Sequence, residues 1–390
     1  MLITIHNKHF IFDFANVRLA ALAVAVLAAG GCLAGQPDDA AQTAVSPSVI
    51  AVPFPVPLPP TRYKIETYNV QLRPVAACVT SECDDEIYNM SNQTRAGLIA
   101  SKLLADDPDV IVLNEPFHEG ARDVLVEQLT ARYPTVVEKL KDNPSLREDA
   151  GLMLFAKLDA IAVPTPTDGE CFQPGTSGTC VVAFHRYRNR AGADALVQNG
   201  IGFVRLQNPA TGRPLNVFFT HLQANESGLP LAESQAARAG QIDEARAFIN
   251  QWAPSSALDQ DTVLAGDLNV HGATDADEDD PSFQEYRDQI TGAGGFGGLG
   301  LQDTHRLAAS PTDPMFSFDG ELDSAQRGGS RSRLDYILFR PAAAGVGACV
   351  QQTTLRRGYH VETAPGDGYI GTDLSDHFAL DVTIGRAGAN

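Results

Sequence analysis

Basic residues are the scarce class in this sequence of 390 residues. Lysine and arginine number 29 against 48 aspartates and glutamates, which leaves a formal net charge of −19. A uniformly acidic surface repels the phosphates of duplex DNA, so the charge argues against a nucleic-acid packaging protein. Apolar residues make up 44% and charged residues 20% of the chain. That balance excludes a disordered chain, a collagen-like fibre and a disulfide-dense miniprotein, and it is typical of a soluble globular protein.

No apolar run in the sequence is long enough to cross a bilayer as a helix, which takes about 20 residues. The longest run, LAALAVAVLAA at residues 19–29, has the length of the hydrophobic part of a secretory signal. The stretch LAAGGC, which ends at Cys32, is similar to a lipobox, in which the cysteine becomes lipidated. Plain cleavage near Ala34 is the alternative. We predict that residues 1–32 direct export, and that the protein is secreted or lipid-anchored at a bacterial cell envelope.

Residues 33–60 end in SPSVIAVPFPVPLPP, where nearly every second residue toward the end is a proline. Because proline fixes φ and removes a backbone donor, this segment is predicted to be an extended tether. No second linker of this quality and no internal repeat follow it. We therefore predict one folded domain over residues 61–390, although two small domains would also fit that length.

The sequence lacks the cysteine spacing of a zinc site, because its six cysteines include no two CxxC segments and no cysteine pair followed by a histidine pair. In an exported protein, cysteines close in sequence form disulfides. Cys78 with Cys83 and Cys171 with Cys180 are close enough in sequence to close small loops, which leaves Cys349 over, but the sequence does not fix the connectivity. The segment DGECFQPGTSGTC around the second pair is predicted to be a surface loop, with a flap over a site as the alternative.

Short apolar strands alternate with amphipathic helices in the rest of the sequence. Helices are predicted over residues 92–104, 121–133 and 233–252, because apolar side chains recur there at the helical period. Many strands with interspersed helices indicate an α/β layered fold. The predicted strands are residues 63–70, 109–113, 151–156, 181–184, 215–222, 262–269, 334–339 and 378–384.

Acid, amide and imidazole side chains stand at the ends of these strands, where α/β proteins place their sites. Taken alone, His221 is more often a structural histidine and Glu115 a solvated strand end. Asp335 alone is equally a partner for Arg331 or Arg333. The evidence lies in the ordered set of Asn69, Glu115, His221, Asp267, Asn269, Asp335, Asp376 and His377.

Carboxylates gathered in one cavity are costly unless they are paired, hydrogen-bonded or bound to a metal. A divalent cation is the simplest solution for this set, and oxygen ligands without thiolate favour Mg²⁺, Mn²⁺ or Ca²⁺ over zinc. Magnesium sites combine one or two carboxylates with water and substrate phosphate. The set therefore predicts metal-assisted attack of water on a phosphate ester.

The motifs around these residues resemble those of a known superfamily. The resemblance to the endonuclease/exonuclease/phosphatase (deoxyribonuclease-like) superfamily is carried, in order, by ETYNV, IVLNEPF, FFTHLQA, LAGDLNVH, SRLDYILF and LSDHFAL. A narrower resemblance to bacterial neutral sphingomyelinases rests on LNE followed by an aromatic residue, on THLQA and on NQTRAGLIASKL. It covers about residues 63–384 and implies a single-domain, four-layer α/β/β/α sandwich of two mixed sheets flanked by helices.

The resemblance implies a magnesium enzyme, with Mn²⁺ or Co²⁺ as substitutes for Mg²⁺. Glu115 would be the main Mg²⁺ ligand with Asn69 beside it, and Asp376 would support the network on the metal side.

The resemblance also implies the residues that move protons. His377 would be the general base that activates water, oriented by Asp335, because an imidazole has a pKa near neutrality. Asp267 and Asn269 would hold the nucleophile and a phosphate oxygen. His221 would bind phosphate and protonate the leaving alkoxide. Whether His377 or Asp267 takes the proton from water is open.

One segment departs from the family. Members that damage membranes carry an exposed hairpin with adjacent tryptophan and phenylalanine before the SDH motif. Here the segment RRGYHVETAPGDGYIGTDLSDH has only Tyr359 and Tyr369 as aromatic residues, and the sole tryptophan, Trp252, is on a predicted helix. Because interfacial anchoring relies on exposed aromatic side chains, strong membrane insertion is not expected.

Three functions fit these observations. The first is hydrolysis of sphingomyelin at a membrane surface to ceramide and phosphocholine, by a monomer that binds no nucleic acid stably. The second is a secreted Mg²⁺-dependent endonuclease on the same scaffold. The arginines that suit the phosphates of either substrate do not discriminate between the two: Arg331, Arg333, Arg356 and Arg357. The third is a non-catalytic binding protein, against which the complete polar set argues. THLQA and the export signal favour the first.

Overall fold

The computed structural model describes most of the chain from Arg62 onward. All described residues belong to one unit of the chain, Ala40–Asn390. The predicted export signal, the tether, the Cys78–Cys83 pair and Tyr369 lie outside the described residues. The described residues are 62–74, 88, 90–140, 148–167, 169–209, 211–254, 256, 260–272, 280–307, 315–320, 330–342, 348–357, 359–361 and 372–386.

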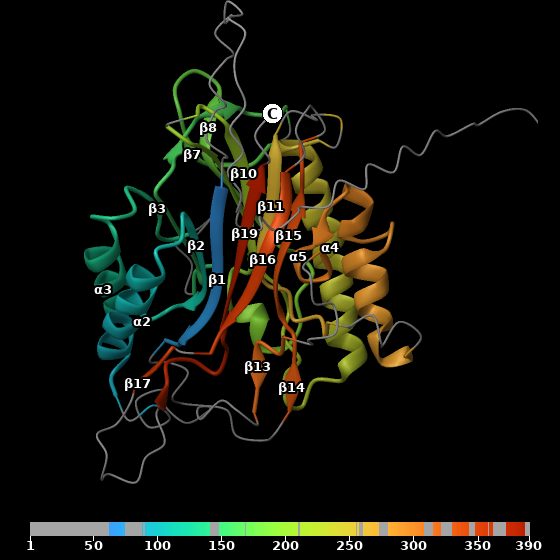
Figure 1. Ribbon diagram of the computed structural model, residues 1–390. Helices are drawn as coiled ribbons and strands as arrows, with labels where there is room; N and C mark the ends of the chain where they lie inside the picture. Colours follow the sequence, from blue (N-terminus) through green and yellow to red (C-terminus); the bar gives the residue numbers. More distant parts are fainter. Residues whose placement is uncertain are drawn as a thin grey trace, which may run out of the picture. The chain divides into compact units, whose positions relative to one another are not determined.

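A six-stranded sheet forms one inner layer of the fold (Figure 1). In spatial order it contains β16 (Ala348–Arg356), β19 (Ala379–Arg386), β1 (Arg62–Leu72), β2 (Val110–Pro116), β4 (Leu152–Ala156) and β3 (Thr135–Val137). The neighbours β1 and β2 run parallel and the other described pairs antiparallel, so the sheet is mixed.

A nine-stranded sheet forms the second inner layer, and β10 and β11 are its parallel pair among the described strands. Its main path contains β12 (Gln302–Asp303), β15 (Asp335–Arg340), β11 (Asp261–Asp267), β10 (Pro214–His221), β9 (Gly200–Gln207), β8 (Thr179–Arg186) and β6 (Val163–Pro164). Shorter strands pair beside this path or apart from it: β5 (Asp159–Ala160) with β9, β7 (Cys171–Pro174) with β8, β13 (Phe318–Asp319) with β14 (Arg331–Ser332), and β17 (His360–Val361) with β18 (Thr372–Asp373).

Helices cover the outer faces of both sheets (Figure 1). The helices α2 (Asn92–Asp106) and α3 (Glu119–Leu129) share an apolar cluster with the six-stranded sheet, and α4 (Leu231–Trp252) shares one with the nine-stranded sheet. A third cluster lies between the sheets. These three cores confirm the four-layer α/β/β/α fold. Shorter helical segments are Gly192–Leu196, Pro281–Phe283, Tyr286–Thr291, Phe296–Leu299 and α5 (Thr304–Leu307).

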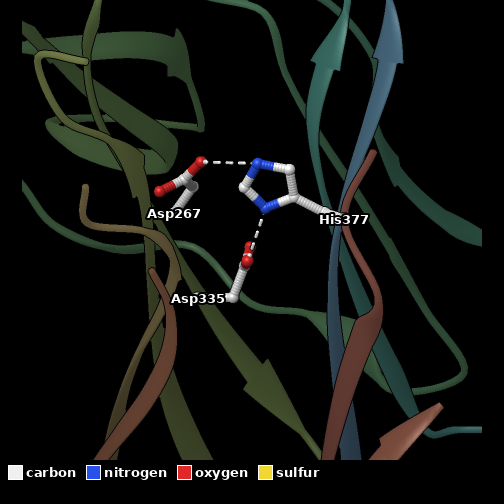
Figure 2. A group of neighbouring side chains, drawn as sticks. All are labelled: Asp267, Asp335 and His377. Carbon is white, nitrogen blue, oxygen red and sulfur yellow. Dashed lines mark hydrogen bonds and ion pairs between the residues drawn. The ribbon is translucent and has the colours of Figure 1, made fainter. Parts of the chain in front are cut away.

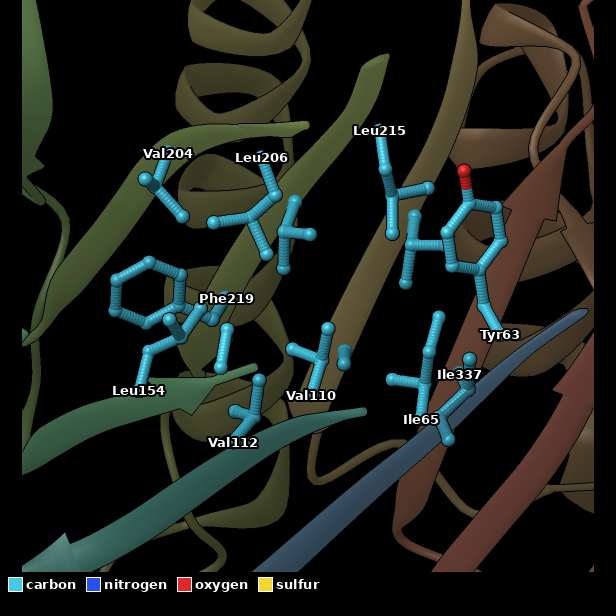
Figure 3. Packing of buried hydrophobic residues seen from close by; sticks show 14 of the residues in the cluster. Tyr63, Ile65, Val110, Val112, Leu154, Val204, Leu206, Leu215, Phe219 and Ile337 are labelled. Atoms are coloured by element: carbon cyan, nitrogen blue, oxygen red, sulfur yellow. The ribbon is translucent and has the colours of Figure 1, made fainter. Parts of the chain in front are cut away.

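Strand alternation decides which side chains reach the space between the sheets, because successive side chains of a strand point to opposite faces. In β1, Tyr63 and Ile65 lie in the inter-sheet cluster (Figure 3). Tyr68 and Val70 instead pack on the side of α2 and α3. The same alternation turns Asn69 toward the other sheet. The apolar inter-sheet cluster is therefore followed, at the strand ends, by polar side chains on the same face.

The structure corrects the sequence interpretation at one helix end and at two strands, β9 and β16, that had not been predicted. The helix predicted over residues 121–133 runs from Glu119 to Leu129, and it cannot continue through Tyr133 because a residue before proline avoids the helical conformation. The sequence interpretation missed β9 entirely. Its glycines weaken the strand pattern, and a Cβ at Gly202 would lie 2.4 Å from the Phe219 ring that packs there.

Cys171 and Cys180 form a disulfide, as predicted, with Cα atoms 5.7 Å apart. It joins β7 to β8 at the edge of the nine-stranded sheet, which agrees with the surface-loop prediction. Cys349 is disulfide-bonded as well, so the prediction that it is left over is wrong. Its partner lies outside the described residues, and proximity in sequence gave no signal for the pair. Among the described residues, no helix has the length and hydropathy of a membrane span.

One buried carboxylate lies within β1, away from the strand ends. Glu66 has no solvent exposure and accepts a hydrogen bond from the Tyr359 hydroxyl at 2.6 Å. Burial raises the pKa of Glu66 from 4.5 to about 8; Asp106 and Asp381 add to the rise, while the Tyr359 bond and Lys64 oppose it. Between these pH values the folded protein holds a proton that the unfolded chain releases. The free energy of unfolding therefore falls as pH rises through this range.

Glu66→Gln is expected to remove this pH dependence, because glutamine keeps the shape and neutrality of the protonated acid. Urea denaturation between about pH 5 and pH 8 measures it. The wild type is expected to lose up to about 1.4 kcal/mol per pH unit from this group, and the variant to be the more stable protein at the upper end. Glu127→Gln, exposed on α3, is the matched control and should keep the wild-type slope. Equal slopes for wild type and Glu66→Gln contradict the assignment.

Candidate active site

Three predicted site residues stand in a row at one end of the nine-stranded sheet. His221 ends β10 and Asp267 ends β11, and they are register partners in the parallel pair. Asp267 is opposite Asp335, the first residue of β15. The close approach of β10 and β11 here requires Gly266, whose φ is +144° and whose Cβ, if present, would lie 1.9 Å from the carbonyl oxygen of Thr220.

His377 reaches this row from the six-stranded sheet, where it stands two residues before β19. Figure 2 shows its ring between Asp335 and Asp267. The distance from Nδ1 to Asp335 Oδ2 is 2.7 Å, and from Nε2 to Asp267 Oδ2 it is 3.8 Å. Burial alone lowers the pKa of His377, but the carboxylates of Asp335, Asp267 and Asp376 outweigh burial and hold the pKa well above its usual value. The ring is thus fixed through Nδ1, and Nε2 faces Asp267.

Asn69 connects carboxylates from the two sheets. Its Nδ2 donates to Glu115 Oε1 at 2.9 Å and to Asp267 Oδ2 at 3.1 Å. Burial and the charge of Asp335 raise the pKa of Asp267, and His377, His221 and Asn69 only partly oppose this rise. Glu115 differs from Asp267 because its side chain keeps 22% exposure. Its backbone φ is 62°, a sparsely populated conformation of the kind that clusters at functional sites.

His221 and Asn269 lie together on the other side of Asp267. His221 Nε2 is 3.7 Å from Asp267 Oδ2 and 4.0 Å from Glu115 Oε1. Asn269 Nδ2 is 3.1 Å from His221 Nε2 and donates to Leu222 O at 3.0 Å, while its backbone N–H donates to Asp267 Oδ1 at 2.9 Å. His221 Nδ1 is buried with no hydrogen-bond partner among the described residues. His221 can therefore form one further hydrogen bond through Nδ1.

Asp376 completes the set, on the side of Glu115. Burial raises the pKa of Asp376 to about 6; the charge of Glu115 adds to the rise, and His377 and Arg95 oppose it. Its Oδ2 accepts a hydrogen bond from Gln71 Nε2 at 2.5 Å. The structure thus brings all eight predicted site residues into one region.

Sequence reasoning missed two residues of this region. Asn114 binds both strands beside the site, because its Nδ2 donates to Thr220 O at 2.9 Å and its Oδ1 accepts from the Asp267 N–H at 3.3 Å. Its position next to Glu115 at a strand end was a usable signal. Asp194 lies in a short helical segment, where no strand end marked it. Burial raises its pKa to about 6, and the charges of Glu115 and His221 act on it in opposite directions.

The alternative partners considered for Asp335 lie elsewhere. Arg333 Nη1 is 2.7 Å from Asp303 Oδ2, and Arg331 Nε is 3.0 Å from Asp319 Oδ1. The Asp335 carboxylate instead bonds His377. This favours the interpretation of Asp335 as an orienting group over that of a surface ion-pair partner.

The donor set fits a hard divalent cation. Burial is the main cause of the raised pKa values of Asp267 and Asp376, and the neighbouring carboxylates of Asp335 and Glu115 add to them, so a bound cation would offset both effects. Ligand atoms of Asp267, Asp335 and His377 also lie within 4.8 Å of one another, but His377 Nδ1 and Asp335 Oδ2 already satisfy each other. The accessible carboxylate of Glu115, with Asn69 beside it, is therefore the better ligand for a metal that retains water.

The sequence matches the Endonuclease/Exonuclease/phosphatase family over residues 67–377, a range that contains the whole candidate site. The chain belongs to this family. Enzymes of the Endonuclease/Exonuclease/phosphatase family and its sphingomyelinases are metal-dependent, which agrees with the donor set.

Relatives of the chain within the family include sphingomyelinases. Sphingomyelinase C of Listeria ivanovii is 27% identical over 229 residues, which cover 55% of this chain and 58% of that protein. Sphingomyelinase C of Leptospira interrogans is 28% identical over 258 residues, which cover 63% and 40%. The chain thus spans about half the length of these relatives. A Staphylococcus aureus beta toxin mutant solved with bound magnesium ions shares the fold, at 20% identity and a TM-score of 0.58 over 83% of this chain and 99% of that one.

Proposed function

We propose that this chain is an exported, Mg²⁺-dependent phosphodiesterase that hydrolyses sphingomyelin to ceramide and phosphocholine. The observation that carries the proposal is the placement of His377 between Asp335 and Asp267, near the accessible carboxylate of Glu115. An oriented imidazole next to a hard-cation ligand is what attack of water on phosphorus requires. The relatives named sphingomyelinase C support the choice of substrate.

Each residue has a defined task in this reaction. Mg²⁺ held by Glu115 and Asn69 would polarise the phosphate and offset its charge. His377 is oriented by Asp335 through Nδ1, so Nε2 of the neutral ring is the atom that accepts the proton of the attacking water. Asp267, 3.8 Å from that nitrogen, is the other candidate for this proton.

The opposite wall of the site binds the phosphate and the leaving group. When its ring is protonated, His221 Nε2 can donate to a phosphate oxygen, and Asn269 Nδ2 lies 3.1 Å from this nitrogen, beside that oxygen. His221 in its protonated form also supplies the proton that the leaving ceramide alkoxide takes up. Asp376 supports the network on the metal side, next to Glu115.

Cellular location follows from the amino-terminal sequence in this proposal. Residues 1–32 act as the export signal, Cys32 is the site of lipidation if the protein is anchored, and residues 33–60 are the tether of a catalytic domain that spans residues 61–390. The domain works as a monomer at the lipid surface.

The test compares lipid and DNA as substrates of the purified protein, with Mg²⁺ or with EDTA. EDTA-sensitive release of phosphocholine from sphingomyelin micelles, with supercoiled DNA left intact, is the expected result. Micelles should be hydrolysed faster than vesicles, because the segment before the SDH motif lacks the tryptophan and phenylalanine of membrane-damaging relatives. DNA nicking with inert lipid would instead assign the chain to the nucleases. Inactivity toward both substrates would favour a binding protein.

A further inference from the structure

Gln71 occupies an unusual position beside the candidate site. It lies where the pairing of β1 with β2 shifts register, between Asn69 and Leu72. Its φ is 44°, in the left-handed region that residues other than glycine adopt only where their surroundings hold them. The hydrogen bonds of Gln71 stabilise this backbone conformation.

Every polar group of Gln71 is hydrogen-bonded. Its backbone N–H donates to Asn69 Oδ1 at 3.1 Å, and its carbonyl accepts from Arg95. The side-chain Nε2 donates to Asp376 Oδ2 at 2.5 Å, and Oε1 accepts from the Tyr88 hydroxyl. Because Tyr88 donates to the amide oxygen, the amide nitrogen is the atom directed at Asp376.

Two hydrogen bonds at consecutive residues join β1 to the loop that carries His377. One is the bond from Gln71 to Asp376. In the other, Ser375 Oγ donates to the carbonyl oxygen of Asn69 at 2.6 Å. The backbone N–H of His377 donates in turn to Ser375 Oγ at 3.3 Å. The loop is thus fixed to the six-stranded sheet directly before the histidine.

The imidazole of His377 has its partners on the other sheet, because Asp335 and Asp267 belong to β15 and β11. Its place between them depends on how the loop is fixed to β1. We propose that Gln71 is a positioning residue for hydrolysis: it holds Asp376 and thereby sets where His377 stands against Asp335 and Asp267. The proposal rests on the proposed function.

Gln71→Met tests the proposal, because methionine keeps the side-chain length and the backbone strain but forms neither hydrogen bond. We expect kcat on a soluble phosphocholine ester to fall about tenfold to hundredfold, which is the effect of losing a hydrogen bond to a charged group. KM should change less than about twofold, because substrate contacts are kept. The proton resonance of the His377 Nδ1–H group should also shift or broaden. Gln352→Met, exposed on β16, is the matched control and should change neither readout.

Tyr88→Phe provides a second variant that leaves Gln71 in place. It should lower kcat less than Gln71→Met does, and the double variant should be no slower than Gln71→Met, because the hydroxyl acts through the amide. An unchanged kcat together with an unchanged His377 resonance in Gln71→Met overturns the proposal, as does a lower melting temperature alone. The resonance is read without substrate. It therefore tests the positioning even if the wild type hydrolyses no phosphocholine ester.

Discussion

His377→Ala is expected to lower kcat for phosphocholine release by about 10²–10⁴-fold, the range for removal of a general base. Asp335 fixes the imidazole through Nδ1, at 2.7 Å, and leaves Nε2 to face Asp267 and the attacking water. Without it, water loses its proton acceptor, but the phosphate contacts of His221 and Asn269 remain. The loss should therefore appear in kcat, and KM should stay nearly constant.

Steady-state kinetics on sphingomyelin micelles measure this effect. Added imidazole should restore part of the activity of His377→Ala, because the deleted side chain leaves room beside Asp335. Asp335→Asn, which keeps the shape but not the charge of the orienting group, should lose activity in the same direction. His185→Gln on β8, whose ring bonds Glu244, is the control histidine and should be fully active. A change in kcat smaller than tenfold for His377→Ala, below the range of general-base effects, would transfer the base role to Asp267.

Glu115→Gln is expected to remove the Mg²⁺-dependent activity by at least about a hundredfold, because loss of outer-shell partners alone costs 10–100-fold at metal sites. Glutamine retains the side-chain shape and can still accept the hydrogen bond from Asn69, but it lacks the charge that a hard cation requires. The fold should survive, because the Glu115 side chain is partly exposed and belongs to no apolar cluster.

Calorimetric titration with Mg²⁺ measures the metal affinity of this variant without any substrate, and thermal unfolding measures its stability. Glu119→Gln is the matched control: it removes a carboxylate four residues away, on the exposed start of α3, where the side chain is 80% exposed. The control should bind Mg²⁺ and turn over substrate like the wild type. Wild-type Mg²⁺ affinity and turnover in Glu115→Gln would show that the metal is held by Asp267 and its neighbours instead.

Much of the fold could be predicted from local patterns, because strands and helices with strong apolar periods have a local signal. The strands around Asn69, His221 and Asp267 are of this kind, and so is α2, whose buried face follows the helical period. β9 and the end of α3 were mispredicted for the opposite reason. Gly202, which admits the Phe219 ring, and the proline after Tyr133 override the local apolar pattern.

The sequence by itself determined which polar residues end apolar strands, and the two-residue period places Asn69, His221 and Asp267 on the same face as the inter-sheet apolar residues of their strands. Only the tertiary structure decided which of them meet. His221, Asp267 and Asp335 are neighbours because β10, β11 and β15 are adjacent in this register. Adjacency of strands is set by packing over long separations in the chain, and a local pattern carries no information on it.

The same reason explains the residues that the sequence did not reveal. Gln71 and Asp194 are polar residues without an apolar pattern of their own, and their roles come from groups distant in sequence. Asp376 is 305 positions from Gln71, and its hydrogen bond exists only because β19 pairs with β1. The sequence thus predicts the types of residue at the site. Their distances, their raised pKa values and their supporting contacts arise only when the two sheets pack face to face.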